Sequence, residues 1–170
     1  DVINKGVSEE DLQNATKKAF EMGWNSVKLY FMIGLPTETY DDLDGIAKLA
    51  YDVIDMYREV HNGKLKRSFG VTVSTSTFVP KPFTPFQWAP MERPEVVTER
   101  IKAIKYAIKS KAVSYKYHHQ DTSLMEAVFA RGDRRTCATL IKAFEKGAKF
   151  DGWSEYFSMD IWNEAMAECN

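Results

Sequence analysis

Three short segments of the sequence carry residues that could bind a ligand or move a proton. They are Gly34 to Thr39 (Gly-Leu-Pro-Thr-Glu-Thr), the pair His118 and His119 with Asp121 nearby, and the charged run Arg131 to Arg135. Glycine lets backbone approach a ligand closely, imidazole exchanges protons near neutral pH, and arginine binds phosphate or carboxylate. Each segment also has a purely structural interpretation, so the elements around it decide between the two.

The Gly34–Thr39 segment either binds a ligand or forms a plain turn between a strand and a helix. A helix that begins after it would offer free backbone N–H groups to an anion. The segment lacks the G-x-x-x-x-G-K-[ST] pattern of a P-loop and the G-x-G-x-x-G pattern of dinucleotide-binding folds. From the residue types alone, the plain turn is the favoured interpretation.

Metal and thiol chemistry have little support in the sequence. His118 and His119 are adjacent, so on a strand they point to opposite sides and cannot easily bind one metal together. Cys137 and Cys169 are far apart and form no C-x-x-C unit. We interpret Cys137 as a buried thiol and Cys169 as a near-terminal thiol. A disulfide framework is not expected, which favours a reducing cytoplasmic location.

Two charged segments near the C-terminus are interpreted as mainly structural. The run Arg131 to Arg135 could clamp an anion, but helix capping and salt bridges between helices explain it as well. The aromatic segment 150–157 has interleaved acids, and we expect most of its rings to lie in a core. Asp151 and Glu155 could face a pocket, although their spacing fixes no role.

The overall composition is that of an ordinary soluble globular chain. The chain has 170 residues and a formal net charge of -1, so no global field draws it to nucleic acid or membranes. No apolar run approaches the roughly 18 residues of a membrane span. The first residues, Asp1 to Gly6, have neither a basic region nor an apolar core, so they are not a signal peptide. They also lack an initiator Met, which suggests an internal piece of a longer protein.

Hydrophobic spacing predicts strands that alternate with helices. The expected helices cover about 8–22, 39–60 and 94–108, and the expected strands cover 27–33, 70–78 and 113–117. Three further helices are expected in the tail, at about 122–131, 134–146 and 158–168. Alternation of this kind indicates βαβ units and a parallel sheet in an α/β fold.

Three of the segments before the helical tail have a distinctive pattern. Strand 27–33 is almost wholly apolar, which predicts a strand covered on both faces. Strand 70–78 alternates, with Ser74 and Ser76 on its more polar face, which would line a cavity in an open barrel or would simply be the less buried face. The segment 79–94 holds five of the six prolines together with aromatic residues, and we expect it to pack onto the rest of the chain.

Four segments taken in order resemble radical S-adenosylmethionine (radical SAM) enzymes. Residues 28–39 look like the fifth strand of that family, which runs into Gly-Leu-Pro and then Glu-Thr. Residues 73–85 look like the sixth strand and the proline-rich loop after it, as in the methylthiotransferase and coproporphyrinogen dehydrogenase branches. Residues 129–135 and 150–155 resemble a narrower, uncharacterised group of large radical SAM proteins, some of which carry a cobalamin-binding-like domain.

The resemblance implies a partial TIM-like (β/α)6 barrel over residues 1–118 and a helical extension over 119–170. In that family a [4Fe–4S] cluster, held by C-x-x-x-C-x-x-C, reduces SAM to start radical chemistry. No such motif occurs in this chain, so its cysteines would lie upstream of residue 1. As an isolated chain it is therefore expected to be inactive.

The resemblance also assigns candidate site residues. For the adenine side of SAM they are Ile33, Gly34 and Leu35 after one strand, and Val79 and Pro80 after the next. Candidates on the side of the unknown substrate are Ser74, Ser76, His118, Arg131 and Arg134.

Alternative functions remain open at this point. A non-catalytic module that binds a substrate, RNA or a protein partner is compatible with the basic and aromatic segments. An unrelated hydrolase-like enzyme is disfavoured, because the chain has neither G-x-S-x-G nor H-E-x-x-H. Half a barrel would expose a strand edge and an interior face, so we expect the chain to form a homodimer or to cover that face with its tail helices.

Overall fold

The computed structural model describes residues 6–169. The expectation that Asp1 to Gly6 are not a signal peptide concerns a segment that lies almost entirely outside the described residues. Along the chain the elements are α1 (Glu9–Glu21), β1 (Ser26–Ile33), α2 (Tyr40–Val60), β2 (Gly70–Thr77), α3 (Pro94–Ala107), β3 (Val113–Tyr117), α4 (Gln120–Arg131), α5 (Thr136–Glu145) and α6 (Met159–Cys169). The predicted order of helices and strands is confirmed, with boundaries shifted by one or two residues.

The first helices begin where short polar side chains can satisfy free backbone groups. Ser8 accepts a hydrogen bond from the amide of Asp11, and the Asp11 carboxylate accepts one from the amide of Ser8. The amide and the hydroxyl of Thr39 both donate to the Asp42 carboxylate before α2. Pro94 occupies the first turn of α3, where a missing N–H costs nothing.

The three strands form one parallel sheet in the order β1-β2-β3. In register, Ser26 lies opposite Gly70, and Val71 lies opposite Val113. Over the described residues the sheet is open: β1 and β3 each pair on one side only. The predicted α/β fold with a parallel sheet is therefore confirmed, and it is not a closed barrel.

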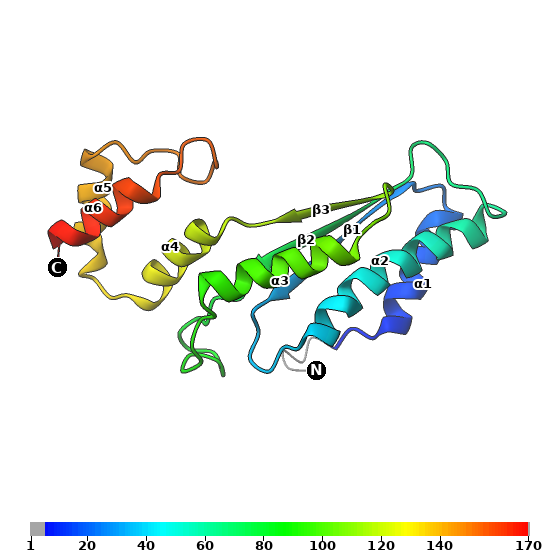
Figure 1. Ribbon diagram of the computed structural model, residues 1–170, viewed down its shortest axis with the longest axis horizontal. Helices are drawn as coiled ribbons and strands as arrows, with labels where there is room; N and C mark the ends of the chain where they lie inside the picture. The colour runs from blue at the N-terminus through cyan, green and yellow to red at the C-terminus, as the bar shows by residue number, and fades with distance from the viewer. Residues whose placement is uncertain (1–5, 170) are drawn as a thin grey trace. The chain divides into compact units, whose positions relative to one another are not determined.

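Helices α1, α2 and α3 pack against one face of the sheet. Leu29 and Ile33 of β1 are 6% and 1% exposed and belong to a core with residues of α1, α2 and α3. Tyr30 and Met32, on the opposite face, are 72% and 39% exposed. Figure 1 shows α2 and α3 side by side along the sheet. The prediction that β1 is covered on both faces is therefore wrong for the described chain.

The core of this part is organised around α2, as its apolar stripe predicted. Buried residues on that helix are Leu43, Ile46, Ala47, Ala50, Val53, Ile54 and Tyr57. The ring of Tyr57 packs against Phe20 and Phe69, with centroids 5.0 and 4.1 Å away. Its hydroxyl donates to the side-chain oxygen of Asn25 at 2.7 Å, so this buried phenol is satisfied.

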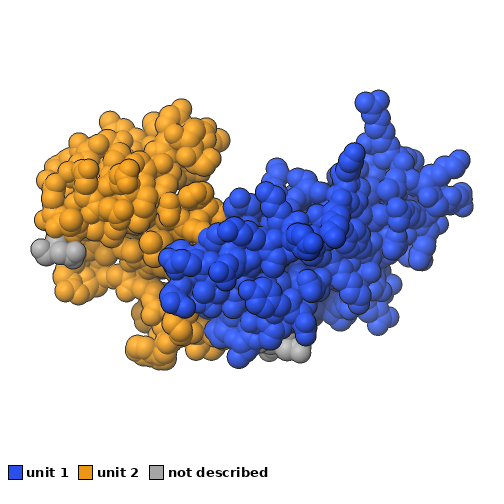
Figure 2. Space-filling view, viewed as in Figure 1, with its two compact units in different colours: residues 1–78, 92–117 blue, residues 79–91, 118–170 orange. Residues whose placement is uncertain are grey.

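The chain divides into two compact units, coloured separately in Figure 2. Unit 1 comprises residues 1–78 and 92–117 and contains the sheet with α1 to α3. Unit 2 comprises residues 79–91 and 118–170 and contains α4 to α6. No helix of the described residues combines the length and the apolar character needed to cross a membrane.

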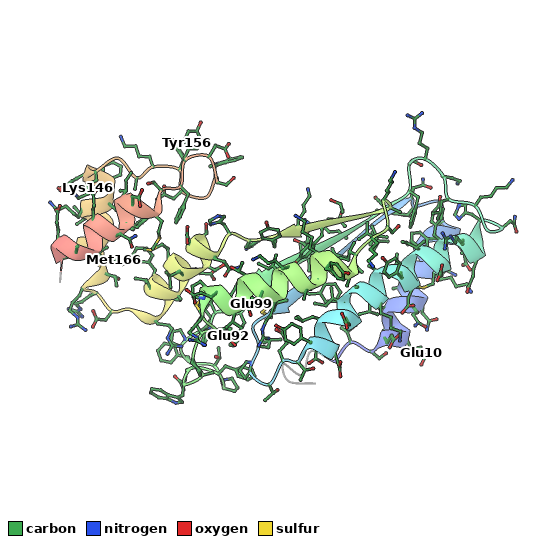
Figure 3. The ribbon with its side chains drawn as sticks, in the orientation of Figure 1. Glu10, Glu92, Glu99, Lys146, Tyr156 and Met166 are labelled. Atoms are coloured by element: carbon green, nitrogen blue, oxygen red, sulfur yellow. The ribbon has the colours of Figure 1, made fainter. Side chains whose placement is uncertain are left out.

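Unit 2 has a small core of its own. Met125, Ala143, Trp162 and Ala165 are buried in it. Lys146, labelled in Figure 3, follows α5 and forms ion pairs with Glu164 and Glu168 of α6.

The predictions for the two aromatic segments have different outcomes, and the one for residues 150–157 is wrong. Phe150, Trp153 and Tyr156 are 73%, 63% and 60% exposed, so most rings of the 150–157 segment lie outside the core. In the proline-rich segment, Phe83 and Trp88 are 96% and 87% exposed. Val79 and Pro80 of the same segment are buried and Phe86 is half-buried, so the segment packs in part as predicted. An ion pair of Lys81 with Glu126 on α4 adds a polar contact within unit 2.

Candidate functional site

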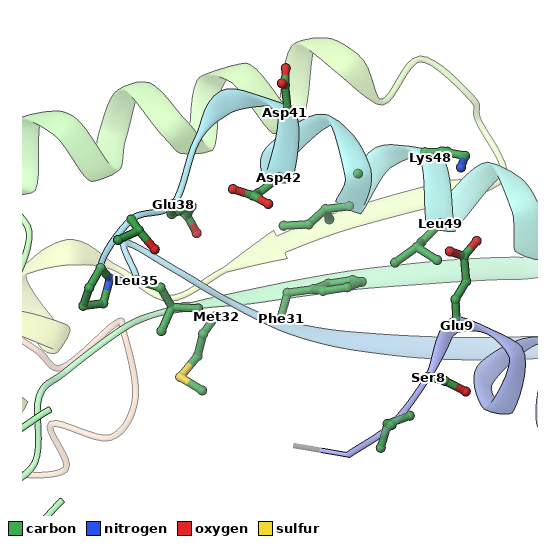
Figure 4. A pocket seen from close by; sticks show the side chains of 15 residues that line it. Ser8, Glu9, Phe31, Met32, Leu35, Glu38, Asp41, Asp42, Lys48 and Leu49 are labelled. Carbon is green, nitrogen blue, oxygen red and sulfur yellow. The ribbon is translucent and has the colours of Figure 1, made fainter. Parts of the chain in front are cut away.

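A groove of about 760 Å³ lies at the carboxyl end of β1, within unit 1. Its walls come from the start of α1, the end of β1, the Gly-Leu-Pro loop and the first half of α2 (Figure 4). Ligands of α/β folds bind at the carboxyl ends of the strands, so this is the end of the sheet where the sequence predicted a site.

The groove has apolar walls and a mostly acidic rim. Phe31, Met32, Leu35, Ile46 and Leu49 supply the apolar lining. The rim carries three exposed carboxylates and one ammonium, which belong to Glu9, Asp41, Asp42 and Lys48. The lining contains no histidine or cysteine, so the groove is equipped to bind an apolar or cationic group rather than to supply a nucleophile.

One of the rim carboxylates already has partners. Asp42 accepts hydrogen bonds from the amide and the hydroxyl of Thr39, and the backbone bond is the larger cause of the lowered pKa of its carboxyl. A carboxylate that is satisfied by its own helix start caps α2. It is therefore less available to a ligand than its position on the rim suggests.

The loop that forms the end of the groove is fixed by a network of ion pairs. The Glu38 carboxylate accepts the backbone N–H of Gly34 at 2.9 Å and pairs with the guanidinium of Arg100 on α3. The Arg100 guanidinium also lies 3.4 Å from the carboxylate of Glu92, a residue two positions before α3. The side chains of Glu38 and Arg100 are 6% and 14% exposed. Arg100 therefore ties the loop after β1 to the segment that leads into α3.

The backbone of this loop turns through two left-handed residues. Gly34 has a φ of 80°, and Thr37 has a φ of 69°. Glycine adopts that conformation freely, but a β-branched residue does so at a cost of order 1–3 kcal/mol. Thr37 directly precedes Glu38 in sequence, and Thr37 itself lines the groove.

The predicted adenine-side residues fall into both units. Ile33 is 1% exposed and its side chain belongs to the core of unit 1. Gly34 has its N–H engaged by Glu38, whereas Leu35 lines the groove. Val79 and Pro80 are buried and belong to unit 2.

The predicted substrate-side serines lie on the open face of the sheet. Ser74 and Ser76 are half-buried, and they alternate along β2 with the buried Val73, Thr75 and Thr77. The hydroxyl of Ser76 makes only a long contact of 3.5 Å with the carbonyl of Phe31. Their position on the more polar face is as predicted from the alternation.

The remaining predicted candidates lie in unit 2 and are exposed. His118 is exposed and has no close polar contact, while His119 approaches Asp121 at 3.6 Å. The Arg131 guanidinium donates to the carbonyl of Ala89 at 3.0 Å, which attaches the proline-rich segment to α4. Arg134 is exposed and contributes its carbonyl to the start of α5.

The rest of the charged junction has the structural role that its residues suggested. Arg135 pairs with Asp133 at 2.9 Å, and the hydroxyl of Thr136 donates to the Asp133 carbonyl at the start of α5. Hydrogen bonds from Arg135 are the main cause of the lowered pKa of the Asp133 carboxyl. Asp151, which had no assigned role, accepts the indole N–H of Trp162 at 3.0 Å.

Neither cysteine has the environment of a metal ligand. Cys137 and Cys169 are both free and exposed, so the prediction of a buried thiol at Cys137 is wrong. It lies on the outer side of the short helix α5, where helical spacing alone could not distinguish it from core positions. Within residues 6–169, no group of three or more His, Cys, Asp or Glu side chains could hold a metal ion.

Sequence reasoning missed one residue that shapes the site, Arg100, and one that joins two strands, Tyr115. Arg100 sits among the apolar positions of α3, and nothing local marks its partner 62 residues away. Tyr115 of β3 shares a 2.9 Å hydrogen bond with the hydroxyl of the buried Thr75. Burial raises the pKa of the Tyr115 phenol, and the bond to Thr75 partly offsets that rise. Alternation in both strands placed the two residues on the same face, which was the available signal.

Comparison with known proteins adds one relative. No family model and no solved structure matches the chain. The chain is 30% identical over 174 residues to the uncharacterized protein MJ0966 of Methanocaldococcus jannaschii. The match covers 96% of this chain and 36% of that protein, so the chain spans about a third of the relative's length.

Proposed function

We propose that this chain is part of a radical SAM iron–sulfur enzyme and contributes one wall of its SAM and substrate site. The observation that carries the proposal is the one-sided parallel sheet. Three parallel strands pack against α1, α2 and α3 through one face, and the other face is exposed, with serine, threonine and lysine side chains beside Tyr30 and Met32. Part of a (β/α) barrel has this arrangement, because its helices lie outside the sheet and the other face of the sheet lines the barrel interior.

The position of the groove also supports the proposal. It lies at the carboxyl end of β1, the end at which barrel enzymes place their sites, and it includes Leu35 of the Gly-Leu-Pro loop. The match to a relative nearly three times as long is compatible with a chain that makes up one portion of a larger enzyme.

The residues of the chain fit the adenine side of SAM better than they fit the cluster. Leu35 and the Cβ-free Gly34 can form an apolar contact with a purine ring, whereas Ile33 can offer only its backbone because its side chain is in the core. The cluster would be held by cysteines that this chain does not contribute. When bound together, cluster and SAM supply a 5′-deoxyadenosyl radical for chemistry on the substrate.

The deciding experiment uses a full-length protein that contains this chain. After anaerobic reconstitution with iron and sulfide, followed by reduction in the presence of SAM, 5′-deoxyadenosine should form. Leu35→Asp should raise the KM for SAM, and Leu65→Asp, a change at an exposed loop leucine of unit 1, should leave it unchanged. A reconstituted protein that holds iron but cleaves no SAM would count against the proposal.

A second function, a non-catalytic module that binds a protein partner, is favoured by one observation in unit 2. An apolar groove of about 670 Å³ is lined by Leu140, Ile141, Phe144 and Phe150, all at least half exposed. Exposed apolar surface of this kind is typical of interaction sites. This alternative would be preferred if the full-length protein retained no iron and left SAM intact.

A further inference from the structure

The open face of the sheet places cationic and hydroxyl side chains in rows. In register, Lys28 of β1 lies beside Thr72 of β2, which lies beside Ser114 of β3. Two residues further along the strands, a second row runs across the sheet from Tyr30 through Ser74 to Lys116. Parallel neighbours are about 4.8 Å apart across strands, so each row is a continuous set of hydrogen-bond donors.

Two lysines lie on this face, and the ammonium of Lys28 extends toward the second row. Lys28 and Lys116 lie two strands apart and two residues apart along the strand, which puts their Cα atoms roughly 12 Å from each other. The Lys28 ammonium lies 4.6 Å from the centre of the Tyr30 ring, so its charge is held over the second row. Ser74 lies between that charge and Lys116.

No negative charge on the strands balances these lysines. The described strands, residues 26–33, 70–77 and 113–117, contain no aspartate or glutamate. Among residues 6–169, no carboxylate lies within ion-pair distance of Lys28 or Lys116, and both lysines are exposed. Elsewhere in the described chain, lysines such as Lys17 and Lys142 pair with glutamates. The face therefore offers positive charge and hydroxyl donors that are complementary to an anion.

We infer that this face binds a phosphate group of a small molecule, held between Lys28 and Lys116 and hydrogen-bonded by Thr72 and Ser74. Lysine binds phosphate as a compact point charge, and these strands provide two lysines and no arginine. Hydroxyls supply the additional donors that a tetrahedral oxyanion accepts. The exposed ring of Tyr30 gives an apolar surface beside the charge for the remainder of such a molecule.

As part of a substrate site, this phosphate subsite rests on the function proposed above. In a barrel it would lie on the interior face, which identifies the substrate class as phosphorylated. Anion binding by the 170-residue chain itself requires neither SAM nor a cluster. It therefore separates failure of the subsite from failure of the radical chemistry.

The test is a titration of the 170-residue chain with inorganic pyrophosphate, followed by amide NMR and by calorimetry. The amide signals of residues 72–76 and 114–116 should shift together and reach a plateau as pyrophosphate is added. Lys28→Ala and Lys116→Ala should each weaken binding about tenfold, the effect of losing one charge-assisted hydrogen bond, and Ser74→Ala should weaken it less. Lys105→Ala, at an exposed position on α3, is the matched control and should bind like the wild type.

Two outcomes would overturn the inference. Equal weakening by Lys105→Ala and Lys116→Ala would mean that pyrophosphate responds only to general surface charge. Tighter binding of citrate than of pyrophosphate, with the same residues perturbed, would mean a carboxylate site. All four positions are exposed or half-buried, so the variants should keep the wild-type circular dichroism spectrum, which verifies that folding is intact.

Discussion

Glu38 and Arg100 form an ion pair between the loop after β1 and α3, with side chains that are 6% and 14% exposed. Glu38 also accepts the N–H of Gly34, and Arg100 also reaches Glu92. Because desolvation opposes the attraction between buried charges, such a pair says little about net stability. It does fix a geometry: the loop that borders the groove is held to α3 by charges that cannot be left unpaired.

Removing one member of this pair should be costly. Arg100→Met leaves the Glu38 carboxylate buried without its partner, and we expect a loss of about 3 kcal/mol in the free energy of unfolding. Urea denaturation measures the loss. Arg58→Met, which breaks an exposed pair with Asp55, is the control and should cost less than about 1 kcal/mol.

A double variant tests whether the stability lost in Arg100→Met comes from the broken ion pair or from lost packing. Arg100→Met combined with Glu38→Gln removes both charges and should recover part of the stability lost by Arg100→Met alone. If the double variant were as unstable as the sum of the two single variants, the two residues would act independently and the ion-pair explanation would be wrong.

Gly34 is expected to tolerate no side chain, for a conformational reason. Its φ is 80°, and an added Cβ would lie 3.4 Å from Cβ of Glu92. Gly34→Ala should therefore destabilise the chain by about 1–2 kcal/mol, the cost of a left-handed L-residue. Gly45→Ala provides the matched comparison, because Gly45 lies within α2 at a helical φ with no atom near its added Cβ. That change should stabilise by about 0.5–1 kcal/mol, since alanine favours helix.

Tyr115 and Thr75 should behave as a coupled pair across β2 and β3. Tyr115→Phe leaves the hydroxyl of Thr75, which is 1% exposed, without this partner and should cost about 1–3 kcal/mol. Adding Thr75→Val removes the orphaned hydroxyl and should restore much of that loss. Thermal denaturation measures these changes. In that assay Tyr30→Phe, at a 72% exposed position, is the control and should change stability by less than about 0.5 kcal/mol.

Much of the fold was readable from local patterns. The stripe of α2 from Leu43 to Tyr57 repeats at helical spacing, and β2 alternates between polar and apolar residues, so both were predicted with their buried faces. The open face of β1 was not, because Tyr30 and Met32 are themselves apolar and hide the alternation. A strand that is apolar on both sides indicates strand structure but does not show whether a second layer covers it.

Long-range contacts were beyond the reach of the sequence. The partnership of Glu38 with Arg100 spans 62 residues, and either residue alone is an ordinary surface charge on a helix or loop. Aromatic content gave a false indication of burial for two residues. Phe83 and Trp88 suggested packing, but they are the most exposed large side chains of the proline-rich segment. Hydrophobicity predicts the tendency of a ring to be buried, but only the arrangement of elements decides whether a partner is present.

The capping box of α2 should give the chain a measurable dependence on acid. Hydrogen bonds from the amide and hydroxyl of Thr39 lower the pKa of the Asp42 carboxyl below its ordinary value of 3.8. A carboxyl whose pKa is lower in the folded state contributes stability above its unfolded pKa of about 3.9, and that contribution disappears as pH falls through the folded pKa.

Carboxyl NMR titration should place the Asp42 midpoint below 3.8. In denaturation at successive pH values, Asp42→Asn should flatten part of the acid-side loss, whereas Asp44→Asn, on the same helix but away from Thr39, should retain the wild-type curve. A midpoint for Asp42 at or above 3.8 would mean that the capping bonds do not persist in solution.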